Sequence, residues 1–313
     1  DNGKVSFCYN EGTATATNNG KNAGVVGYNY CGKVYQCFNT GTITMSAASG
    51  TAGIVGINEA GLVSHCYNTG EINGYDTTGG VVGANDEGSV LKICYNVGNI
   101  KGAHTITGGI AGSNKLASVI SDCYNWGNIY SSIKSTGGIS ATNQGYYKYT
   151  NTPAAQIINC YNIGSVSNGD NKEYGQIFNN TGSVIGDAIN CYYISDTESK
   201  TKEQFNSGEV LNLLNGSVIS TESIWQQEIG VDPYPVFNKN ILFYDGTNYY
   251  DIKTILLPMS SQIRFTRNND GSYANMFDVR TRAMISDEDF KTYIADTNDE
   301  AELIISKVGF VYS

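Results

Sequence analysis

The sequence predicts an all-β protein: a parallel β-helix of about seven coils of roughly 29 residues, a helical cap, and a small β-rich C-terminal domain. Three observations predict this fold. A Cys-aromatic-Asn-x-Gly string recurs six times, and a second glycine-rich string recurs with the same period. The 313 residues include 37 Gly but only 4 Pro, a composition typical of β-rich or solenoid proteins.

Seven cysteines define the period of the repeat: Cys8, Cys37, Cys66, Cys94, Cys123, Cys160 and Cys191. They follow one another at intervals of 29, 29, 28, 29, 37 and 31 residues. The second string reads AGVVGYN at 23–29, AGIVGIN at 52–58, GGVVGAN at 79–85, GGIAGSN at 108–114 and GGISATN at 137–143. Self-similarity at such a period indicates a solenoid, propeller or repeat array. Both strings hold short β-branched runs between Gly and Asn, which favour short strands between turns.

Two other repeat folds have similar periods. Leucine-rich repeats reach 29 residues, but residues 1–196 contain only Leu62, Leu91 and Leu116. A propeller blade needs four strands and about 40 or more residues. A parallel β-helix needs only two or three short strands per coil, and we therefore predict that fold.

Each column of the stack then acquires a role. Aliphatic residues three positions before the cysteines form an interior ladder, and the cysteines fill a narrow core as small hydrophobes. The aromatic residues after the cysteines stack on one another. We expect the following Asn to adopt left-handed geometry at a turn, and the Gly to permit a tight corner.

The even number of cysteines also allows disulfides between neighbouring coils. Parallel side chains in one column must twist to bond, so we expect most thiols to be free and buried. Cys31 lies outside the column, and we expect it in a turn with an exposed thiol. A catalytic pair of His65 and Cys66 is disfavoured because neighbours in a strand point to opposite faces. Structural zinc is disfavoured because paired Cys-x-x-Cys spacing is missing.

The string GIVG at 53–56, like GVVG at 80–83, resembles the GLUG motif, which is named for Gly-Leu-hydrophobic-Gly. The resemblance covers residues 1 to about 196. GLUG repeats occur in bacterial surface and secreted proteins, including the non-catalytic part of IgA-specific metallopeptidases. The resemblance implies a β-helix and an extracellular or cell-surface location, and it assigns no catalytic residue.

Residues 197–240 are predicted to cap the last coil. Thr201 and Gln204 form a candidate capping box, and Val210, Leu211, Leu213 and Leu214 lie on one face of a short helix ended by Gly216. Residues 241–313 alternate apolar and polar positions, with a hairpin turn at 269–272, a short helix at 286–295 and a closing strand at 302–313. We therefore predict a separate β-rich domain there.

The acidic residues bear on the alternative of a polysaccharide-acting enzyme, since such β-helices need clustered carboxylates or a calcium site. We expect the acids to be scattered, with no shared column for Asp76, Asp86, Glu87, Asp122, Asp170 and Glu173. The acidic run at 296–300 lacks the Gly and the spacing of a calcium loop. No catalytic residue, metal site or cofactor is predicted.

One insertion interrupts the repeat. The interval of 37 residues places about eight extra residues within 143–156, and these present Tyr146, Tyr147 and Tyr149. Insertions in solenoids gather on one face, often the binding face, and exposed tyrosines suit contacts with sugars or proteins. The alternative is a neutral loop, because added loop length costs little.

The net charge of −10 argues against nucleic acid, which needs clustered Lys and Arg, and no apolar run is long enough to span a bilayer. The chain starts inside a repeat, so we expect a fragment of a longer bacterial cell-surface protein. The predicted function is a non-enzymatic, adhesin-like or stalk-like interaction module, monomeric, with a host or cell-wall glycan or protein as partner. The alternatives are a polysaccharide-acting enzyme and a non-catalytic flank of a secreted peptidase.

Overall fold

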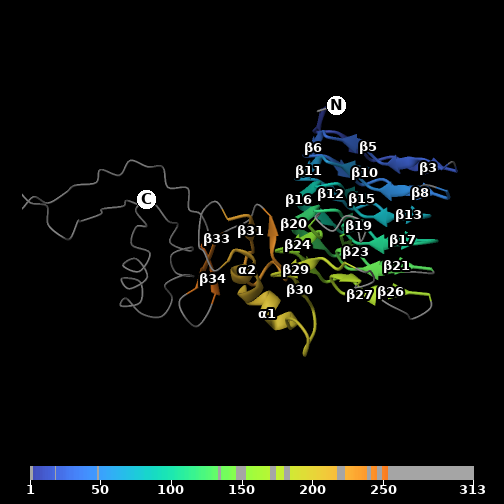
Figure 1. Ribbon diagram of the computed structural model, residues 1–313. Coiled ribbons are helices and arrows are strands. Elements are labelled where there is room, and N and C mark those ends of the chain that lie inside the picture. The colour runs from blue at the N-terminus through green and yellow to red at the C-terminus, as the bar shows by residue number, and fades with distance from the viewer. Residues whose placement is uncertain are drawn as a thin grey trace, which may run out of the picture. The chain divides into compact units, whose positions relative to one another are not determined.

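The computed structural model describes residues 3–252, except for 18, 48, 133–134, 146–152, 170–173, 180–183, 217–222, 238–240 and 245–248. Within these residues the chain winds into a parallel β-solenoid whose coils follow one another in sequence order (Figure 1). Four sheets run along the stack. The predicted fold is confirmed.

Sheet 1 contains the cysteine strings and has twelve strands: β1 (Lys4–Ser6), β2 (Tyr9–Asn10), β6 (Lys33–Tyr35), β7 (Phe38–Asn39), β11 (Leu62–Ser64), β12 (Tyr67–Asn68), β16 (Val90–Asn96), β20 (Val119–Asn125), β24 (Gln156–Ile158), β25 (Tyr161–Asn162), β29 (Asp187–Ile189) and β30 (Tyr192–Tyr193). Sheet 2 has six: β3 (Ala14–Ala16), β8 (Ile43–Met45), β13 (Ile72–Gly74), β17 (Ile100–Gly102), β21 (Ile129–Ser131) and β26 (Val166–Asn168).

The glycine-rich strings form the other two sheets. Sheet 3 consists of β4 (Lys21–Ala23), β9 (Gly50–Ala52), β14 (Thr78–Gly79), β18 (Thr107–Gly108), β22 (Thr136–Gly137) and β27 (Tyr174–Gly175). Sheet 4 consists of β5 (Val26–Tyr30), β10 (Val55–Glu59), β15 (Val82–Asp86), β19 (Ala111–Lys115), β23 (Ser140–Gln144) and β28 (Phe178–Asn179).

The solenoid has about six turns, one fewer than the sequence predicts. Sheets 2, 3 and 4 each have six strands. The seventh coil contributes only β29 and β30, which pair with β24 and β25 in sheet 1. The chain then leaves the stack for the cap, so the seventh cysteine marks an incomplete coil.

The aliphatic and cysteine columns form the core, as predicted. Val34, Val63 and Leu91 are in register with one another and are fully buried. They share one hydrophobic cluster with the cysteines from Cys37 to Cys160. Protein interiors are packed as densely as organic crystals. The small cysteine side chain therefore suits the narrow space between the aliphatic residues.

The asparagine column differs from its prediction. Asn39, Asn68 and Asn96 are fully buried, and none of them has a positive φ. The Nδ2 of each donates to the Oδ1 of the next coil's asparagine at 2.7 Å, and also to the carbonyl oxygen two residues ahead at 2.8 Å. The column is therefore an interior amide ladder, because both amide protons have a partner in every coil.

The left-handed position lies instead directly before each cysteine. There φ is between 51° and 56° in all seven coils: Phe7, Gln36, His65, Ile93, Asp122, Asn159 and Asn190. Such φ values are uncommon for residues other than glycine. They let the backbone of sheet 1 bend directly before each cysteine, between two strands in most coils and within β16 and β20 in the other two, while the cysteine keeps its side chain in the core.

The glycine of the Cys-aromatic-Asn-x-Gly string is needed because the backbones of adjacent coils approach closely at this position, and not because the chain turns there. A Cβ on Gly70 would lie 2.0 Å from the carbonyl oxygen of Gly41 in the preceding coil. The corresponding distance is also 2.0 Å for Gly98 and Gly127. Only a residue without a side chain fits between coils at this position.

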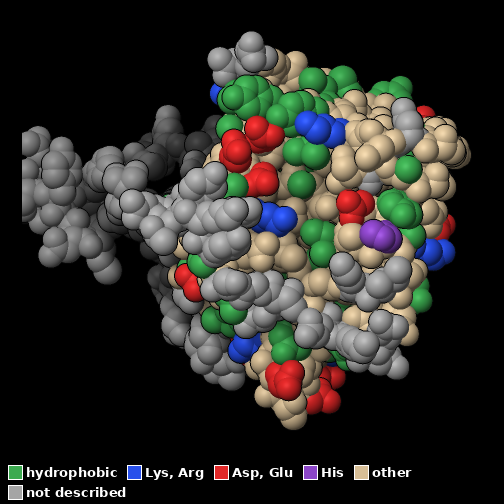
Figure 2. All heavy atoms as spheres, turned by 45° about the vertical axis from the view of Figure 1, so that its right-hand side comes forward, with side chains coloured by type: hydrophobic (Ala, Val, Ile, Leu, Met, Phe, Trp, Pro, Cys, Tyr) green, Lys and Arg blue, Asp and Glu red, His purple; other side chains and the backbone are tan. Residues whose placement is uncertain are grey.

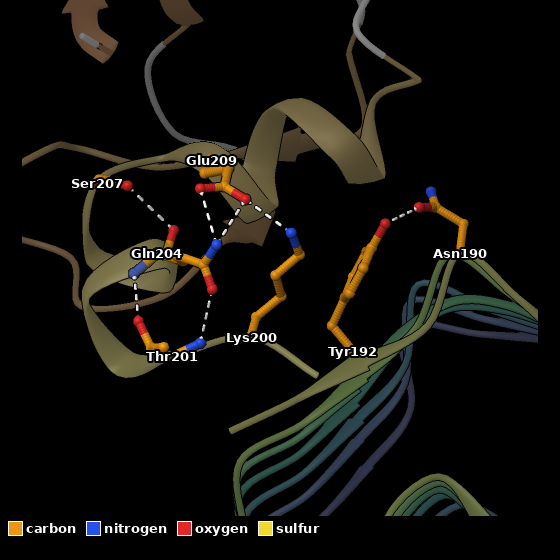
Figure 3. A network of polar contacts seen from close by, with 7 residues as sticks. All are labelled: Asn190, Tyr192, Lys200, Thr201, Gln204, Ser207 and Glu209. Atoms are coloured by element: carbon orange, nitrogen blue, oxygen red, sulfur yellow. Dashed lines mark hydrogen bonds and ion pairs between the residues drawn. The ribbon is translucent and has the colours of Figure 1, made fainter. Parts of the chain in front are cut away.

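The predicted cap contains α1 (Lys202–Asn206) and α2 (Glu209–Leu214), followed by the antiparallel pair of β31 (Trp225–Gln226) and β32 (Val236–Phe237). The capping box of Thr201 and Gln204 is confirmed. Gln204 also donates to Glu209, which forms an ion pair with Lys200 at 2.7 Å (Figure 3). These contacts fix α1 against α2.

The position of the cap differs from expectation. We expected it to cover the open edge of the last coil, and one contact does so, since Asn190 Nδ2 donates to the carbonyl oxygen of Leu213 at 2.9 Å. Most of its buried side chains, however, pack on the flank of the solenoid. Phe205, Leu214 and Trp225 share a hydrophobic cluster with Tyr124 and Tyr161.

The predictions for residues 241–313 can be compared with the structure only in part. Strands β33 (Ile241–Tyr244) and β34 (Tyr249–Ile252) form an antiparallel pair. The chain divides into compact units at Asp1–Ile252 and Lys253–Ser313. The predicted hairpin turn at 269–272, helix at 286–295, acidic run at 296–300 and closing strand at 302–313 lie outside the described residues.

The amide ladder makes a quantitative prediction. Replacing Asn96 with Ala leaves the amide of Asn68, the carbonyl of Gly98 and the amide of Asn125 without their partners. Each unpaired buried group costs about 1–3 kcal/mol, so we expect urea denaturation to show a stability loss of at least about 3 kcal/mol.

Asn10→Ala is the matched control, because Asn10 lies in the first coil and is only half-buried. We expect a smaller loss of about 1–3 kcal/mol there, because of the groups left unpaired only the Oδ1 of Asn39 is fully buried. Equal losses at the two positions would contradict the ladder as a buried, cooperative element.

Candidate functional site

The predicted binding loop leaves the solenoid at a defined corner. Tyr146, Tyr147 and Tyr149 lie outside the described residues, so their binding role stays a prediction. The flanks are described: Gly145 donates its N–H to the carbonyl oxygen of Val184 at 2.9 Å, and the carbonyl oxygen of Pro153 accepts from Ala117 at 3.0 Å. The insertion therefore starts directly after β23, at the end of sheet 4.

The aromatic column stacks as predicted. Successive rings from Tyr9 to Tyr161 lie parallel, with centroids 4.9–5.3 Å apart and interplanar angles of 3–7°. The cap covers only the C-terminal part of this column. Trp225 and Phe237 contact Tyr124 at centroid distances of 6.0 and 5.2 Å, whereas Tyr9 is 60% exposed.

One position in the string explains where the cap begins. The residue after the ladder asparagine is Thr40 and Thr69 in the uncovered coils, but Trp126 and Ile163 in the covered ones. Both of the latter pack against the cap cluster, and Trp126 Nε1 donates to the hydroxyl of Tyr161 at 2.8 Å. The switch from polar to apolar residues at this position marks the docking site of the cap.

All eight cysteines are free thiols. The five from Cys37 to Cys160 are buried, and burial raises the pKa of the Cys123 thiol well above its usual value. Cys31 lies at a left-handed corner with a φ of 53° and is half-buried. His65 is exposed while Cys66 faces the core, so the structure does not bring the two together as a catalytic pair.

A second outward surface combines tyrosines and carboxylates at the end of sheet 4. Tyr30, Glu59 and Asp86 end the first three strands of this sheet, in register, and Tyr28 lies two residues before Tyr30 on the same face. We call these four residues the tyrosine–carboxylate face. Figure 2 shows acidic side chains gathered beside hydrophobic and basic ones on one face of the molecule.

Short contacts hold this face in place. The hydroxyl of Tyr28 donates to Glu59 Oε2 at 2.6 Å, and this hydrogen bond to a carboxylate raises the pKa of Tyr28 to about 12. Lys21 Nζ lies 3.5 Å from the centre of the Tyr28 ring, a cation–π contact. The Tyr28 and Tyr30 rings lie 6.1 Å apart and are 42% and 48% exposed.

The two carboxylates have different environments. Partial burial raises the pKa of Asp86, although the Glu87 N–H, which donates to it at 2.9 Å, and the charge of Lys115 act in the opposite direction. Glu59 instead accepts a hydrogen bond from the hydroxyl of Tyr28. Neighbouring carboxyl groups in unlike environments can take unlike protonation states.

The set of acids considered from the sequence did not include Glu59, which shares a column with Asp86. Glu59 and Asp86 occupy one column on adjacent coils, because each follows the asparagine of the glycine-rich string directly: GIN-E at 56–59 and GAN-D at 83–86. Comparison of the two strings could have found the pair. Among the described residues, no group of three or more His, Cys, Asp and Glu is arranged to hold a metal ion.

The thiol column makes a chemical prediction. In the native protein, alkylation should modify Cys8, Cys31 and Cys191, which are exposed or half-buried. The other five should react only after denaturation without reductant. Intact mass measures both sets, and pairs that stay unlabelled and 2 Da lighter would show disulfides in place of free thiols.

Asp86 makes a pH-dependent prediction. A carboxyl whose pKa is higher in the folded state binds its proton more tightly there, so stability falls as pH rises through that pKa. Asp86→Asn should therefore stabilise the protein at pH 7, and its advantage should vanish in acid, below the ordinary Asp pKa of about 4.

Thermal unfolding between pH 3 and pH 7 measures this difference. Glu87→Gln is the control, since it removes a charge from the neighbouring exposed position. A destabilising effect of Asp86→Asn that is the same at every pH would contradict the assignment.

Comparisons with known proteins support the fold alone. No family model matches the chain, and no curated protein matches it. The chain is similar in structure to the crystal structure of a "putative immunoglobulin A1 protease" from Bacteroides ovatus, with a TM-score of 0.52 and 20% sequence identity over 74% of each chain. Among the described residues, no helix has the length and apolar character to cross a membrane.

Proposed function

We propose that this chain is a non-catalytic interaction module of an extracellular bacterial surface protein, and that it binds a glycan through the tyrosine–carboxylate face. The observation that carries the proposal is the placement of two exposed tyrosine rings beside two carboxylates, all on adjacent coils. Aromatic rings pack against the apolar faces of sugars, and carboxylates accept hydrogen bonds from their hydroxyl groups.

The negative charge of the tyrosine–carboxylate face favours binding of some classes of glycan over others. Glu59 and Asp86 lie in the face, and the whole chain has a net charge of −10. Like charges facing each other weaken binding, so uronate polymers are disfavoured. We propose a neutral or amino-sugar polysaccharide of a host surface or a cell wall as the ligand.

Binding to immobilised polysaccharides tests this function. Residues 1–313 should bind a neutral or amino-sugar polymer, and the double variant Tyr28→Ser, Tyr30→Ser should weaken that binding at least tenfold, since both exposed ring surfaces of the face are lost and tenfold corresponds to only about 1.4 kcal/mol. Tyr174→Ser is the matched control, because Tyr174 is 50% exposed in sheet 3. Equal loss in both variants, or binding to uronates alone, would contradict the proposal.

A second candidate is a polysaccharide-acting enzyme, favoured by the alignment of Glu59 and Asp86. Glycoside hydrolysis uses one carboxylic acid that donates its proton and a second carboxylate, and Asp86, whose pKa is raised by partial burial, lies in one column with Glu59. Release of reducing ends from the bound polymer, abolished by Glu59→Gln and by Asp86→Asn, would establish the enzyme. Binding without release supports the module.

A third candidate is a non-catalytic flank of a larger secreted peptidase, favoured by the name of the Bacteroides ovatus protein. In that case the chain itself does not cleave immunoglobulin A1, and a catalytic domain of a longer precursor does. Incubation of immunoglobulin A1 with residues 1–313 tests whether this chain itself has cleavage activity. Cleavage by this chain would contradict both the flank and the interaction module.

A further inference from the structure

An amine and a carboxamide meet on one carboxylate where the chain passes from the solenoid to the cap. Lys200 Nζ lies 2.7 Å from Glu209 Oε1. The side-chain amide of Gln204 donates to the same oxygen at 2.9 Å and to Oε2 at 3.1 Å. Figure 3 shows the three side chains converging between α1 and α2. The capping box itself uses only Thr201 and Gln204, so the lysine and the glutamate are additional to it.

The backbone fixes each of these residues separately. Lys200 is anchored on the last coil, because its N–H donates to the carbonyl oxygen of Tyr193 at 3.2 Å and its own carbonyl oxygen accepts from Ser195 at 2.9 Å. Gln204 is held by the capping box of α1, and Glu209 is the first residue of α2. Groups that folding has already positioned react without a further entropic cost of bringing them together.

The amide of Gln204 is polarised in a defined orientation. Its Oε1 accepts a hydrogen bond from the backbone N–H of Thr201 at 2.9 Å, while its Nε2 faces the carboxylate of Glu209. Addition of a nucleophile to the amide carbon would place negative charge on Oε1, and a fixed N–H donor stabilises such a charge. The amide nitrogen, which would have to leave, lies against a group that can deliver a proton.

Solvent has only partial access to this arrangement. The side chains of Lys200 and Glu209 are 23% and 32% exposed. Partial exclusion of water strengthens the electrostatic interactions within the group and limits hydrolysis of the amide as a competing reaction. A nucleophile, a proton acceptor, a polarised carbonyl group and an oxyanion donor are therefore present together.

We propose that Lys200 and Gln204 form an isopeptide bond, an amide between two side chains. Glu209 takes a proton from Lys200 Nζ, which attacks Cδ of Gln204. The Nζ–Cδ bond forms, the Cδ–Nε2 bond breaks, and Glu209 passes the proton to Nε2. An ammonium group and a carboxamide thus become a secondary amide and an ammonium ion, so the reaction needs no oxidant, reductant or cofactor.

The bond would anchor the cap covalently. It would join the residue at which the chain leaves the last coil to the first turn of α1, a separation of four residues in sequence. This site is separate from the tyrosine–carboxylate face, and the inference is independent of glycan binding.

Mass spectrometry of residues 1–313 tests the proposal. After incubation at pH 7 the intact mass should be about 17 Da below the sequence mass, because one ammonia is lost. Ring closure at an asparagine causes the same loss, so the bond must also be located by digestion with trypsin. The peptide that ends at Lys202 should be joined to the peptide that starts at Glu203, with no cleavage after Lys200.

Three variants test the assigned roles. Lys200→Arg keeps the positive charge for Glu209, but its guanidinium stays protonated and does not attack, so the full sequence mass is expected. Glu209→Gln removes the proton acceptor and should lower the yield of the joined peptide at least tenfold. Lys202→Arg is the matched control, because Lys202 is exposed on α1, and it should keep the loss of ammonia.

Three results would overturn the proposal. The first is the full sequence mass in the unmodified sequence. The second is a loss of about 18 Da, because water leaves when the amine joins a carboxyl group such as Glu209 instead of an amide. The third is a joined peptide in Glu209→Gln at the same yield as in the original chain.

Discussion

The buried amide ladder is the interaction on which the solenoid depends. Each asparagine from Asn39 to Asn125 satisfies a donor and an acceptor in the neighbouring coils at 2.7 Å while being fully buried. A coil shifted by one residue would lose these bonds and turn its core side chains outward. The ladder thus fixes the register in which the thiols, aliphatic side chains and aromatic rings stack, as in other asparagine ladders of layered strands.

The fixed register also determines where side chains on the outer surface of the solenoid lie, including side chains that do not contribute to the core. Because sheet 4 repeats its spacing from coil to coil, the residue after each ladder asparagine of the glycine-rich string appears at one outer corner. Tyr30, Glu59 and Asp86 meet there. The same logic operates on the flank, where the change from Thr69 to Trp126 determines which coils the cap covers. The proposed binding face and the docking site of the cap therefore both use positions that the core leaves free.

The period of the cysteines was enough to predict the fold, the core columns and the aromatic stack, because each depends on sequence spacing alone. The roles of individual residues within a coil were harder to predict from the sequence. An Asn-x-Gly sequence favours a turn by propensity, but burial between coils turned Asn68 into a ladder residue and moved the left-handed position to His65. The helices of the cap were predictable from Thr201 and Leu211, whereas their docking on Tyr161 depends on tertiary packing, of which the sequence shows only the apolar residues Trp126 and Ile163 at the docking position.

The side-chain amides of the ladder provide the most direct measurement. In D₂O, followed by NMR, the Nδ2 protons of Asn39, Asn68, Asn96 and Asn125 should exchange as slowly as the backbone amides of sheet 1, because all are buried and hydrogen-bonded. Asn128, which is exposed, provides the fast reference within the same molecule. Exchange of the four ladder amides at the rate of Asn128 would contradict a solenoid held in register by buried asparagines.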